Sequence, residues 1–248
     1  MKIGMTSLTL QEKSVSEVIR YAKAIGLSGI EWGISDKHVC MGNAERTEEI
    51  KLLSKKSGLE IFSLGSYCYM ETADECDSAL ETAVLLGAPV IRIWAGKHSP
   101  CDADAVYRKK IADNSRYMAD MAAHHGISLG FEYHPYTLTE TCEEALALIR
   151  YVNRENVSLY WQPNQSLSLE KNILDRDKIL PYCVGNIHIQ NYTEENGYGL
   201  LSEIRERLRA YFGAIKNQSY RIMIEFVKDS LPENLTRDAE TLRTMLGL

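Results

Sequence analysis

The sequence predicts an α/β fold, a (β/α)₈ TIM barrel that forms a single domain over residues 1–248. Eight short apolar or alternating runs start roughly 30 residues apart, the length of a strand, a helix and two loops. A helix-compatible segment follows each run. The nucleotide-binding patterns Gly-x-Gly-x-x-Gly and Gly-x-x-x-x-Gly-Lys-Ser/Thr are both absent, which favours a closed barrel over a doubly wound open sheet. The predicted strands are 2–7, 29–33, 60–67, 90–96, 128–134, 157–164, 184–191 and 221–227.

Signals at the helix ends support this alternation in chain order. Before the second to fifth strands, a helical pattern ends at a glycine, which can take the left-handed conformation that caps a helix. The first, third and fifth helices start with Ser or Thr followed three residues later by Glu, the spacing of a capping box. Pro232 suits the first turn of the last helix. The glycines are Gly26, Gly58, Gly87 and Gly126, and the capping pairs are Ser14 with Glu17, Thr72 with Glu75, and Thr141 with Glu144.

Charge and cysteine content limit the functional classes. The formal net charge is −6 and Lys and Arg are spread along the chain, which argues against a general nucleic-acid binder. No apolar run is long enough to cross a membrane, and no cleavable signal precedes the first strand. The six cysteines include no Cys-x-x-Cys pair, so we expect reduced thiols in a cytoplasmic protein. Barrels of this size often associate, so the state stays open between a monomer and a homo-oligomer.

Polar side chains gather late in the predicted strands, at the end where (β/α)₈ enzymes place their active sites. The stretch 128–135 contains Glu132 and His134, which point the same way because side chains alternate along a strand. An acid and an imidazole are costly to bury without a partner or a function. The other strands contribute Glu31, Arg92, Trp94, Gln162, Asn164, Asn186, His188, Gln190 and Glu225.

Four of these residues form a candidate ligand set for a divalent metal. Two carboxylates, one imidazole and one amide come from four successive strands. Carboxylate oxygen together with imidazole nitrogen suits Mn²⁺, Mg²⁺, Co²⁺ or Zn²⁺. The set is Glu132, Gln162, His188 and Glu225.

Four strand motifs follow one another in the second half of the chain: Leu129-Gly-Phe-Glu132-Tyr-His134, Val157-Ser-Leu-Tyr-Trp-Gln162, Gly185-Asn-Ile-His188-Ile-Gln190-Asn191 and Ile222-Met-Ile-Glu225-Phe. Their order resembles the xylose-isomerase-like barrel superfamily, the sugar phosphate isomerase/epimerase group. In that family Glu, Asp, His and Glu from strands five to eight bind one divalent cation, and the two Glu residues also handle protons. The resemblance therefore implies metal-binding roles for Glu132, Gln162, His188 and Glu225, and catalytic roles for Glu132 and Glu225.

Two motifs depart from the family pattern. The family's strand-six Asp, followed three residues later by His, becomes Gln162 and Gln165. The strand-seven pattern His-x-Lys-Asp becomes His188-Ile-Gln190-Asn191. An amide oxygen brings no charge, so the ligand set carries about −2 rather than −3 and we expect weaker cation binding. The substrate or the metal dependence is therefore expected to differ from the family norm.

The remaining strand-end residues are candidates for substrate binding. His134, Arg92 and Lys228 suit hydroxyl or phosphate groups, although Arg92 could instead neutralise a buried Glu132. A tryptophan can stack on a sugar face, although most buried tryptophans belong to the core. The candidate set is His134, Arg92, Glu31, Trp94, Trp161, Asn164, Gln190 and Lys228.

These observations favour an enzyme that isomerises or epimerises a small sugar or sugar phosphate by moving a proton next to a carbonyl group. A bound metal would polarise the carbonyl while Glu132 and Glu225 act as base and acid. Two alternatives stay open, a keto-sugar or inosose dehydratase of the same fold and a non-catalytic sugar-binding descendant that has lost its metal. A metal phosphodiesterase of this fold is disfavoured, because its three-metal cluster needs many His and Asp residues and the chain has six His.

Overall fold

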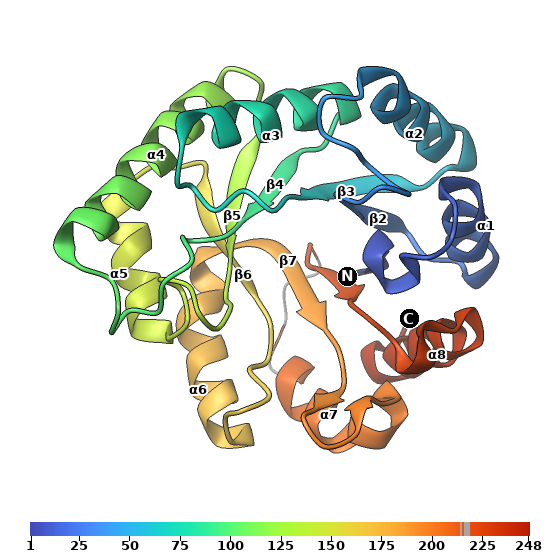
Figure 1. Cartoon of the computed structure of the whole chain (residues 1–248). Helices are drawn as coiled ribbons and strands as arrows, with labels where there is room; N and C mark the ends of the chain where they lie inside the picture. Colours follow the sequence, from blue (N-terminus) through green and yellow to red (C-terminus); the bar gives the residue numbers. More distant parts are fainter. Residues whose placement is uncertain (214, 216–218) are drawn as a thin grey trace.

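The computed structural model describes residues 1–213, 215 and 219–248, and within them it confirms the predicted barrel. Eight parallel strands close in the order β1-β10-β7-β6-β5-β4-β3-β2, and β1 pairs with β10 to complete the ring. The chain forms one domain (Figure 1). The barrel strands are β1 (Lys2–Thr6), β2 (Gly29–Gly33), β3 (Glu60–Gly65), β4 (Val90–Ile93), β5 (Ser128–Glu132), β6 (Val157–Trp161), β7 (Cys183–Ile189) and β10 (Arg221–Ile224).

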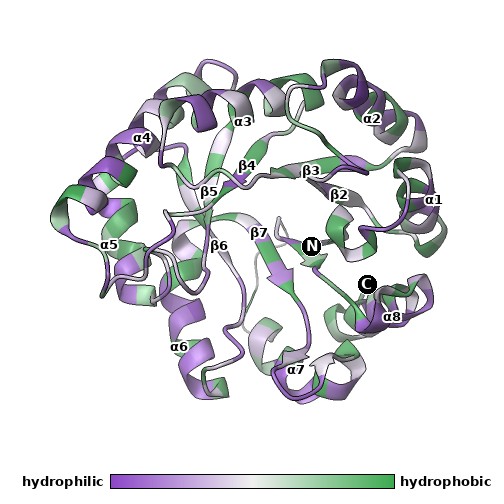
Figure 2. Cartoon of the chain, in the orientation of Figure 1, coloured by the Kyte–Doolittle hydropathy of each residue, from purple (hydrophilic) through white to green (hydrophobic). Residues whose placement is uncertain are grey.

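Helices surround the strands on the outside of the barrel (Figure 1). The helices carry both hydrophilic and hydrophobic residues, and most of the ribbon of α6 is purple (Figure 2). Within the described residues we find no helix whose length and hydropathy would let it span a membrane. The helices are α1 (Val15–Ile25), α2 (Ala44–Ser57), α3 (Ala73–Leu86), α4 (Ala105–Ala123), α5 (Cys142–Val152), α6 (Leu169–Ile179), α7 (Arg205–Phe212) and α8 (Pro232–Leu246), with short 3₁₀ helices η1 (Ser7–Leu10), η2 (Leu180–Tyr182), η3 (Leu201–Ile204) and η4 (Lys228–Ser230).

The predicted helix signals act at most of the positions where the sequence places them. Ser14 and Glu17 form a complete capping box at the start of α1. Thr72 and Thr141 cap α3 and α5, but the glutamates three residues later bond to other partners. Helix α4 ends at Ala123, before the predicted glycine, because a turn separates the two. Left-handed glycines follow α1, α2 and α3 as predicted, at Gly26, Gly58 and Gly87.

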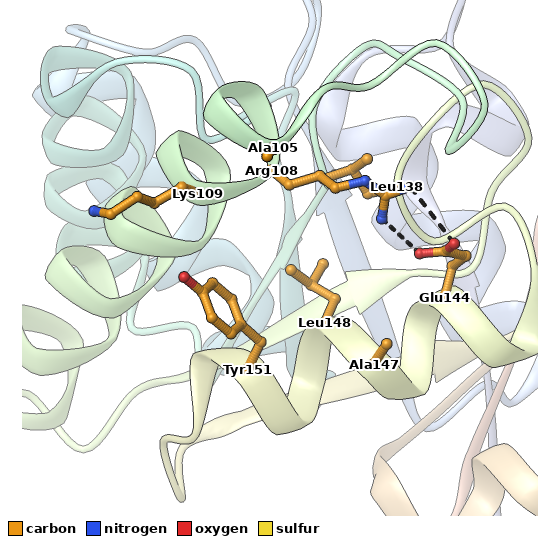
Figure 3. Close-up of a pocket in the computed structure, with 8 residues that line it drawn as sticks. All are labelled: Ala105, Arg108, Lys109, Leu138, Glu144, Ala147, Leu148 and Tyr151. Atoms are coloured by element: carbon orange, nitrogen blue, oxygen red, sulfur yellow. Dashed lines mark hydrogen bonds and ion pairs between the residues drawn. The ribbon is translucent and has the colours of Figure 1, made fainter.

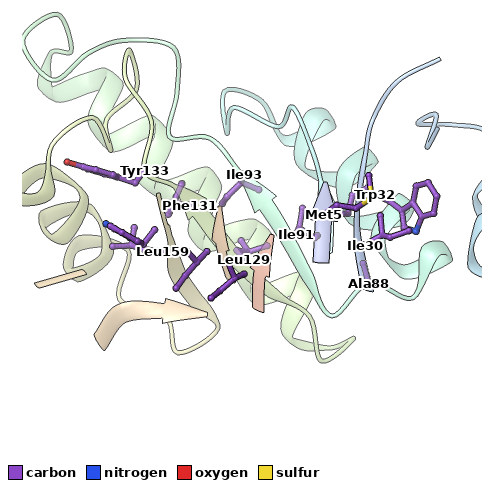
Figure 4. Packing of buried hydrophobic residues seen from close by; sticks show 14 of the residues in the cluster. Met5, Ile30, Trp32, Ala88, Ile91, Ile93, Leu129, Phe131, Tyr133 and Leu159 are labelled. Atoms are coloured by element: carbon purple, nitrogen blue, oxygen red, sulfur yellow. The ribbon is translucent and has the colours of Figure 1, made fainter. Parts of the chain in front are cut away.

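Alternation along the strands separates two apolar layers. Outward-facing side chains such as Ile91, Leu129 and Leu159 join the large core between strands and helices (Figure 4). Inside the barrel, a small separate cluster fills the interior with Phe62, Val90, Tyr160 and Met223. Glycines make room for its rings, because a Cβ at Gly29 would lie 2.4 Å from Phe62. This packing leaves the carboxyl ends of the strands for polar side chains.

Several strands end earlier than the sequence predicts. Strand β4 ends three residues before 96, β6 ends three before 164, and β10 ends three before 227. Gln162 and Glu225 therefore begin loops rather than finish strands. A two-stranded hairpin that the sequence analysis missed, β8 (Tyr192–Thr193) and β9 (Gly197–Tyr198), follows β7.

Candidate active site

The strand ends bring Glu132, His188 and Glu225 together in the buried interior. Atom Nδ1 of His188 lies 3.3 Å from Oε1 of Glu132 and 3.4 Å from Oε1 of Glu225. One ligand atom from each residue lies within 4.8 Å of the other two. Glu132 and His188 are fully buried, and Glu225 is 8% exposed. Three of the four predicted metal ligands therefore converge, although they come from β5, β7 and the loop after β10.

Arg92 joins this cluster to a third buried acid, Glu31. Its Nε lies 3.1 Å from Oε1 of Glu31, and its guanidinium pairs with Oε2 of Glu132. The exposed fraction of Arg92 is 4% and that of Glu31 is 1%, so neither side chain faces the solvent. Arg92 pairs with Glu132, as one of the two roles considered for it requires, and its contact with a substrate stays a prediction. Glu31 is as buried as Glu132, and its contact with a substrate stays a prediction.

Glu132 also receives a hydrogen bond from Trp94, at the mouth of the barrel. The indole Nε1 of Trp94 donates to Oε2 of Glu132. The ring of Trp94 stacks on His134, with centroids 4.4 Å apart and an interplanar angle of 23°. Trp94 therefore connects the buried acid to His134, at the rim of the barrel.

Charges in the cluster oppose the effect of burial. Burial alone would raise the pKa of Glu132, but Arg92 and His188 hold it well below its usual range. Burial alone would lower the pKa of His188, but Glu225 and Glu31 raise it to about 10. Glu225 differs, because its burial raises the pKa to about 7 despite the nearby His188. The imidazole therefore lies in a strongly negative potential.

A divalent cation fits this donor set. Both ring nitrogens of His188 are buried and have no hydrogen-bond partner within the described residues, and two carboxylate oxygens face Nδ1. Electron-rich atoms this close need a proton or a cation among them. Carboxylate and imidazole ligands suit Zn²⁺, Mn²⁺, Mg²⁺ or Co²⁺.

The side-chain amide of Gln162 directs its nitrogen, and not its oxygen, toward the cluster. Atom Nε2 donates to the backbone oxygen of Tyr133 at 2.9 Å and lies 3.3 Å from Oε1 of Glu132. The amide oxygen is buried without a hydrogen-bond partner in the described part of the chain. An amide nitrogen does not bind a cation, so coordination by Gln162 would require the amide to turn and give up the bond to Tyr133. Its role as fourth ligand stays a prediction.

A cavity of about 800 Å³ lies beside the cluster, at the carboxyl ends of β5, β6 and β7. Its size falls within the roughly 300–1,000 Å³ range of small-molecule sites. Asn164 lines it, but its side-chain oxygen already accepts a hydrogen bond from the backbone of Ser166. The predicted residues that line the cavity are His134, Gln162, Asn164 and Gln190.

Two other predicted substrate contacts lie away from this cavity. Trp161 is fully buried on the helix side of β6, where its ring lies 5.7 Å from that of Tyr211. Tyr160 takes the inward position next to it, so Trp161 cannot stack on a sugar in the barrel. Lys228 is exposed in η4 and is not part of the cavity wall.

The hairpin after β7 forms a part of the cavity wall that the sequence analysis missed. Tyr192 and Tyr198 line the cavity, and their ring centroids are 5.1 Å apart. Tyr198 also lies 5.0 Å from the ring of Phe226, beyond β10. The dipeptide Asn196-Gly197 between aromatic residues is a strong hairpin signal and could have revealed this element.

A second cavity, of about 400 Å³, lies between α4 and α5 on the outside of the barrel (Figure 3). Arg108 and Glu144 form an ion pair of 2.6 Å at one end of it. Leu148 and Tyr151 contribute apolar walls. No predicted site residue lines this cavity, so it is separate from the buried cluster.

Solved structures share the whole fold. The IOLI protein with a bound zinc atom matches with a TM-score of 0.77 and 16% identity, over 100% of this chain and 98% of that one. A probable 3-DHS dehydratase from Bacillus anthracis has a TM-score of 0.76 and 18% identity, over 98% of each chain. The complex of D-allulose 3-epimerase from Methylomonas sp. with D-allulose has a TM-score of 0.72 and 17% identity, over 100% of this chain and 96% of that one. At these identities the matches show the fold alone.

Two curated relatives align with parts of the chain. A 3-dehydroshikimate dehydratase from Bacillus anthracis is 26% identical over 170 residues, which are 64% of this chain and 60% of the relative. A 2-oxo-tetronate isomerase from Pectobacterium atrosepticum is 32% identical over 88 residues, 34% of each protein. The chain therefore spans less than two thirds of the length of each of these relatives.

A family model supports the resemblance that the strand motifs indicated. The model for the xylose isomerase-like TIM barrel matches residues 19–242. This range contains Glu132, His188 and Glu225 as well as most of the barrel. Because the match covers most of its length, the chain belongs to the xylose isomerase-like TIM barrel family.

Proposed function

We propose that this chain is an isomerase or epimerase that moves a proton next to the carbonyl group of a sugar or sugar phosphate. The observation that carries the proposal is the pair of acids, Glu132 and Glu225, that lie 3.3 and 3.4 Å from Nδ1 of His188 beside a cavity of about 800 Å³. The similar proteins include epimerases, an isomerase and a dehydratase, which supports an enzyme of this broad class.

The two acids differ in how firmly they are held. Glu132 accepts hydrogen bonds from Arg92 and Trp94 on one oxygen and faces Gln162 with the other. Among the described residues, the carboxylate of Glu225 has one close polar contact, to His188. We therefore assign both the removal of the substrate proton and its return to Glu225, which is free to reorient and whose pKa is raised to about 7, while Glu132 stays ionised beside Arg92 and helps to hold the cation.

The proposed cofactor is a divalent cation held by Glu132, His188 and Glu225. When bound, it would polarise the substrate carbonyl and stabilise the negative charge that develops on its oxygen. Zinc in the IOLI structure and magnesium in a related barrel from Mycobacterium smegmatis support a cation in this fold. The protein groups exclude water beneath the site, because the side chains there are almost fully buried.

Proton exchange tests the proposal. The protein is incubated with Mn²⁺ and a panel of ketoses and their phosphates in D₂O, and deuterium next to the carbonyl is measured by NMR. We expect exchange by the wild type, and a loss of about 10²–10⁴-fold in Glu225→Gln with an unchanged melting temperature in the absence of metal. Glu132→Gln is expected to abolish turnover while the fold stays intact. Glu12→Gln, at an exposed ion pair, is the matched control.

Two outcomes would contradict the proposal. One is a Glu225→Gln variant that exchanges protons at the wild-type rate. The other is a wild-type protein that binds sugars but exchanges no proton, which would identify a non-catalytic sugar-binding descendant.

A dehydratase is the second candidate, because the relative that aligns over 170 residues is a 3-dehydroshikimate dehydratase. Glu225 would remove a proton next to the carbonyl and pass it to the departing hydroxyl group, which leaves as water. Mass spectrometry separates the two reactions, since an isomer keeps the mass of the substrate and a dehydration product lacks one water.

A further inference from the structure

Glu31 occupies the side of His188 that faces away from Glu132 and Glu225. Its Oε1 lies 3.3 Å from Nε2 of His188 and 3.1 Å from Nε of Arg92. Its Oε2 accepts a hydrogen bond of 2.6 Å from Ser63. Both oxygens are therefore occupied, and the carboxylate has one orientation. The chemistry proposed above gives this buried acid no task.

The backbone of β3 is built to let Glu31 and Arg92 approach. A Cβ at Gly65 would lie 2.9 Å from Oε1 of Glu31 and 3.1 Å from a guanidinium nitrogen of Arg92. Gly65 is paired with Gly33 and with Arg92 in the sheet, and its φ lies outside the left-handed region. Glycine is therefore needed at position 65 because it leaves space for Glu31 and Arg92, and not because the backbone takes a left-handed conformation.

We propose that Glu31 is a positioning residue of the metal site, which fixes the ring nitrogen that His188 presents to the cation. With a cation on Nδ1, the one hydrogen of the neutral imidazole lies on Nε2, where the carboxylate of Glu31 is placed to accept it. Nδ1 then directs its lone pair between Glu132 and Glu225. This inference rests on the metal site of the proposed function.

Arg92 extends the effect of Glu31 to a second ligand. The same guanidinium that lies beside Glu31 also pairs with Glu132. Displacement of Glu31 would therefore disturb both the imidazole and one carboxylate of the set. Removal of such a supporting group typically weakens metal binding by about 10–100-fold.

Calorimetric Mn²⁺ titration of the purified full chain tests this role. Glu31→Gln keeps the size of the side chain and removes its charge, and Gly65→Ala keeps every charge and displaces the carboxylate. We expect binding about 10–100-fold weaker in both variants. Glu60→Gln, which breaks a half-exposed ion pair with Lys2, is expected to bind like the wild type. In the zinc-loaded wild type, nitrogen-15 NMR is expected to show His188 with its hydrogen on Nε2.

The outcomes separate this inference from the proposed function. Wild-type affinity in folded Glu31→Gln and Gly65→Ala would overturn the positioning role, as would a hydrogen on Nδ1 in the zinc form. Should Gly65→Ala fail to fold, Ser63→Ala takes its place, because it removes the hydrogen bond to Glu31 and, besides it, a long contact of 3.5 Å with Asn186. A wild type that binds no Mn²⁺ overturns the metal site and the positioning role together. Weaker binding in the variants with no activity on any carbonyl sugar supports the positioning role and overturns the proposed function.

Discussion

At the scale of single residues, the face that each side chain takes separates function from stability. Trp161 follows the alternation of β6 and faces the helices, because Tyr160 takes the inward position. Trp94 comes after the end of β4, and its ring reaches inward to donate to Glu132. Two tryptophans that the sequence analysis treated alike therefore have different surroundings.

This difference predicts opposite effects for two matched substitutions. Trp94→Phe loses the hydrogen bond to Glu132, so we expect kcat/KM to fall about 10-fold or more with little change in stability. Trp161→Phe leaves a small cavity in the core and is expected to cost about 1–2 kcal/mol of unfolding free energy, with kcat/KM unchanged. Steady-state kinetics and urea unfolding of both variants check this. Loss of activity in Trp161→Phe alone would show that the assignment is reversed.

At the scale of elements, the helices of the barrel begin with caps of unequal strength. At α1, Ser14 accepts from the backbone of Glu17, and the Glu17 carboxylate accepts from the backbone of Ser14 at 2.9 Å. At α5, Thr141 caps alone, because Glu144 pairs with Arg108 across to α4. One sequence pattern therefore yields a closed local motif in one helix and a bridge between two helices in another.

The capping box predicts a local loss of stability at α1. Ser14→Ala removes the oxygen that caps the helix, and we expect it to lower the unfolding free energy by about 1 kcal/mol. The position is far from the buried cluster in sequence and lies at a helix start, so turnover should not change. Chemical denaturation with an activity assay checks both statements. A variant as stable as the wild type would contradict the contribution assigned to this box.

At the scale of the whole molecule, the barrel closes around acids that come from distant parts of the chain. The cluster of Glu132, His188 and Glu225 comes from β5, β7 and the loop after β10, and Glu31 beside it comes from β2. These like charges are therefore brought together only when all the strands pair. A cation that binds this assembled set binds the folded state and not the unfolded chain. Metal binding is therefore expected to stabilise the complete fold.

Metal removal tests this coupling. At a Mn²⁺ concentration of about 100 times Kd, binding adds about 2.7 kcal/mol, which corresponds to a rise in Tm of several degrees for a domain of this size. A chelator should reverse the rise. The increase should be smaller in Glu225→Ala, which lacks one ligand. An equal increase in that variant would mean that the ion binds elsewhere.

Asp238 predicts a pH dependence of stability that is independent of the cluster. Burial raises the pKa of this carboxyl from its ordinary value of 3.8 to about 7, although it accepts a hydrogen bond from the backbone of Leu201. Between about pH 4 and pH 7 the folded state thus holds a proton that the unfolded state has released. The contribution of Asp238 to stability is therefore highest below pH 4, falls as the pH rises to 7, and is constant above.

Urea unfolding of the wild type and of Asp238→Asn from pH 4 to pH 8 measures this contribution. The amide does not titrate, so the difference in unfolding free energy between the two proteins should decline with pH by at most about 1.4 kcal/mol per pH unit. The decline should stop near pH 7. Parallel stability curves across this range would refute the assignment to Asp238.

Local patterns in the sequence determined the fold and much of the site. Apolar runs, helix caps and polar residues at the strand ends are properties of neighbouring residues, so they predict the barrel and place Glu132, His188 and Glu225 at one end of it. The hairpin with Tyr192 and Tyr198 also had a local signal, Asn196-Gly197, and was predictable in principle.

Contacts across the interior were decided only by the tertiary structure. Strands β2 and β7 are separated in the ring by β1 and β10, so no spacing in the sequence could show that Glu31 meets His188. The backbone oxygen of Tyr133 determines which way the amide of Gln162 points. The sequence by itself therefore determined which residues reach the centre of the barrel. The partners of these residues depend on side-chain packing among strands that are distant in the chain. Hydrophobic periodicity does not predict that packing.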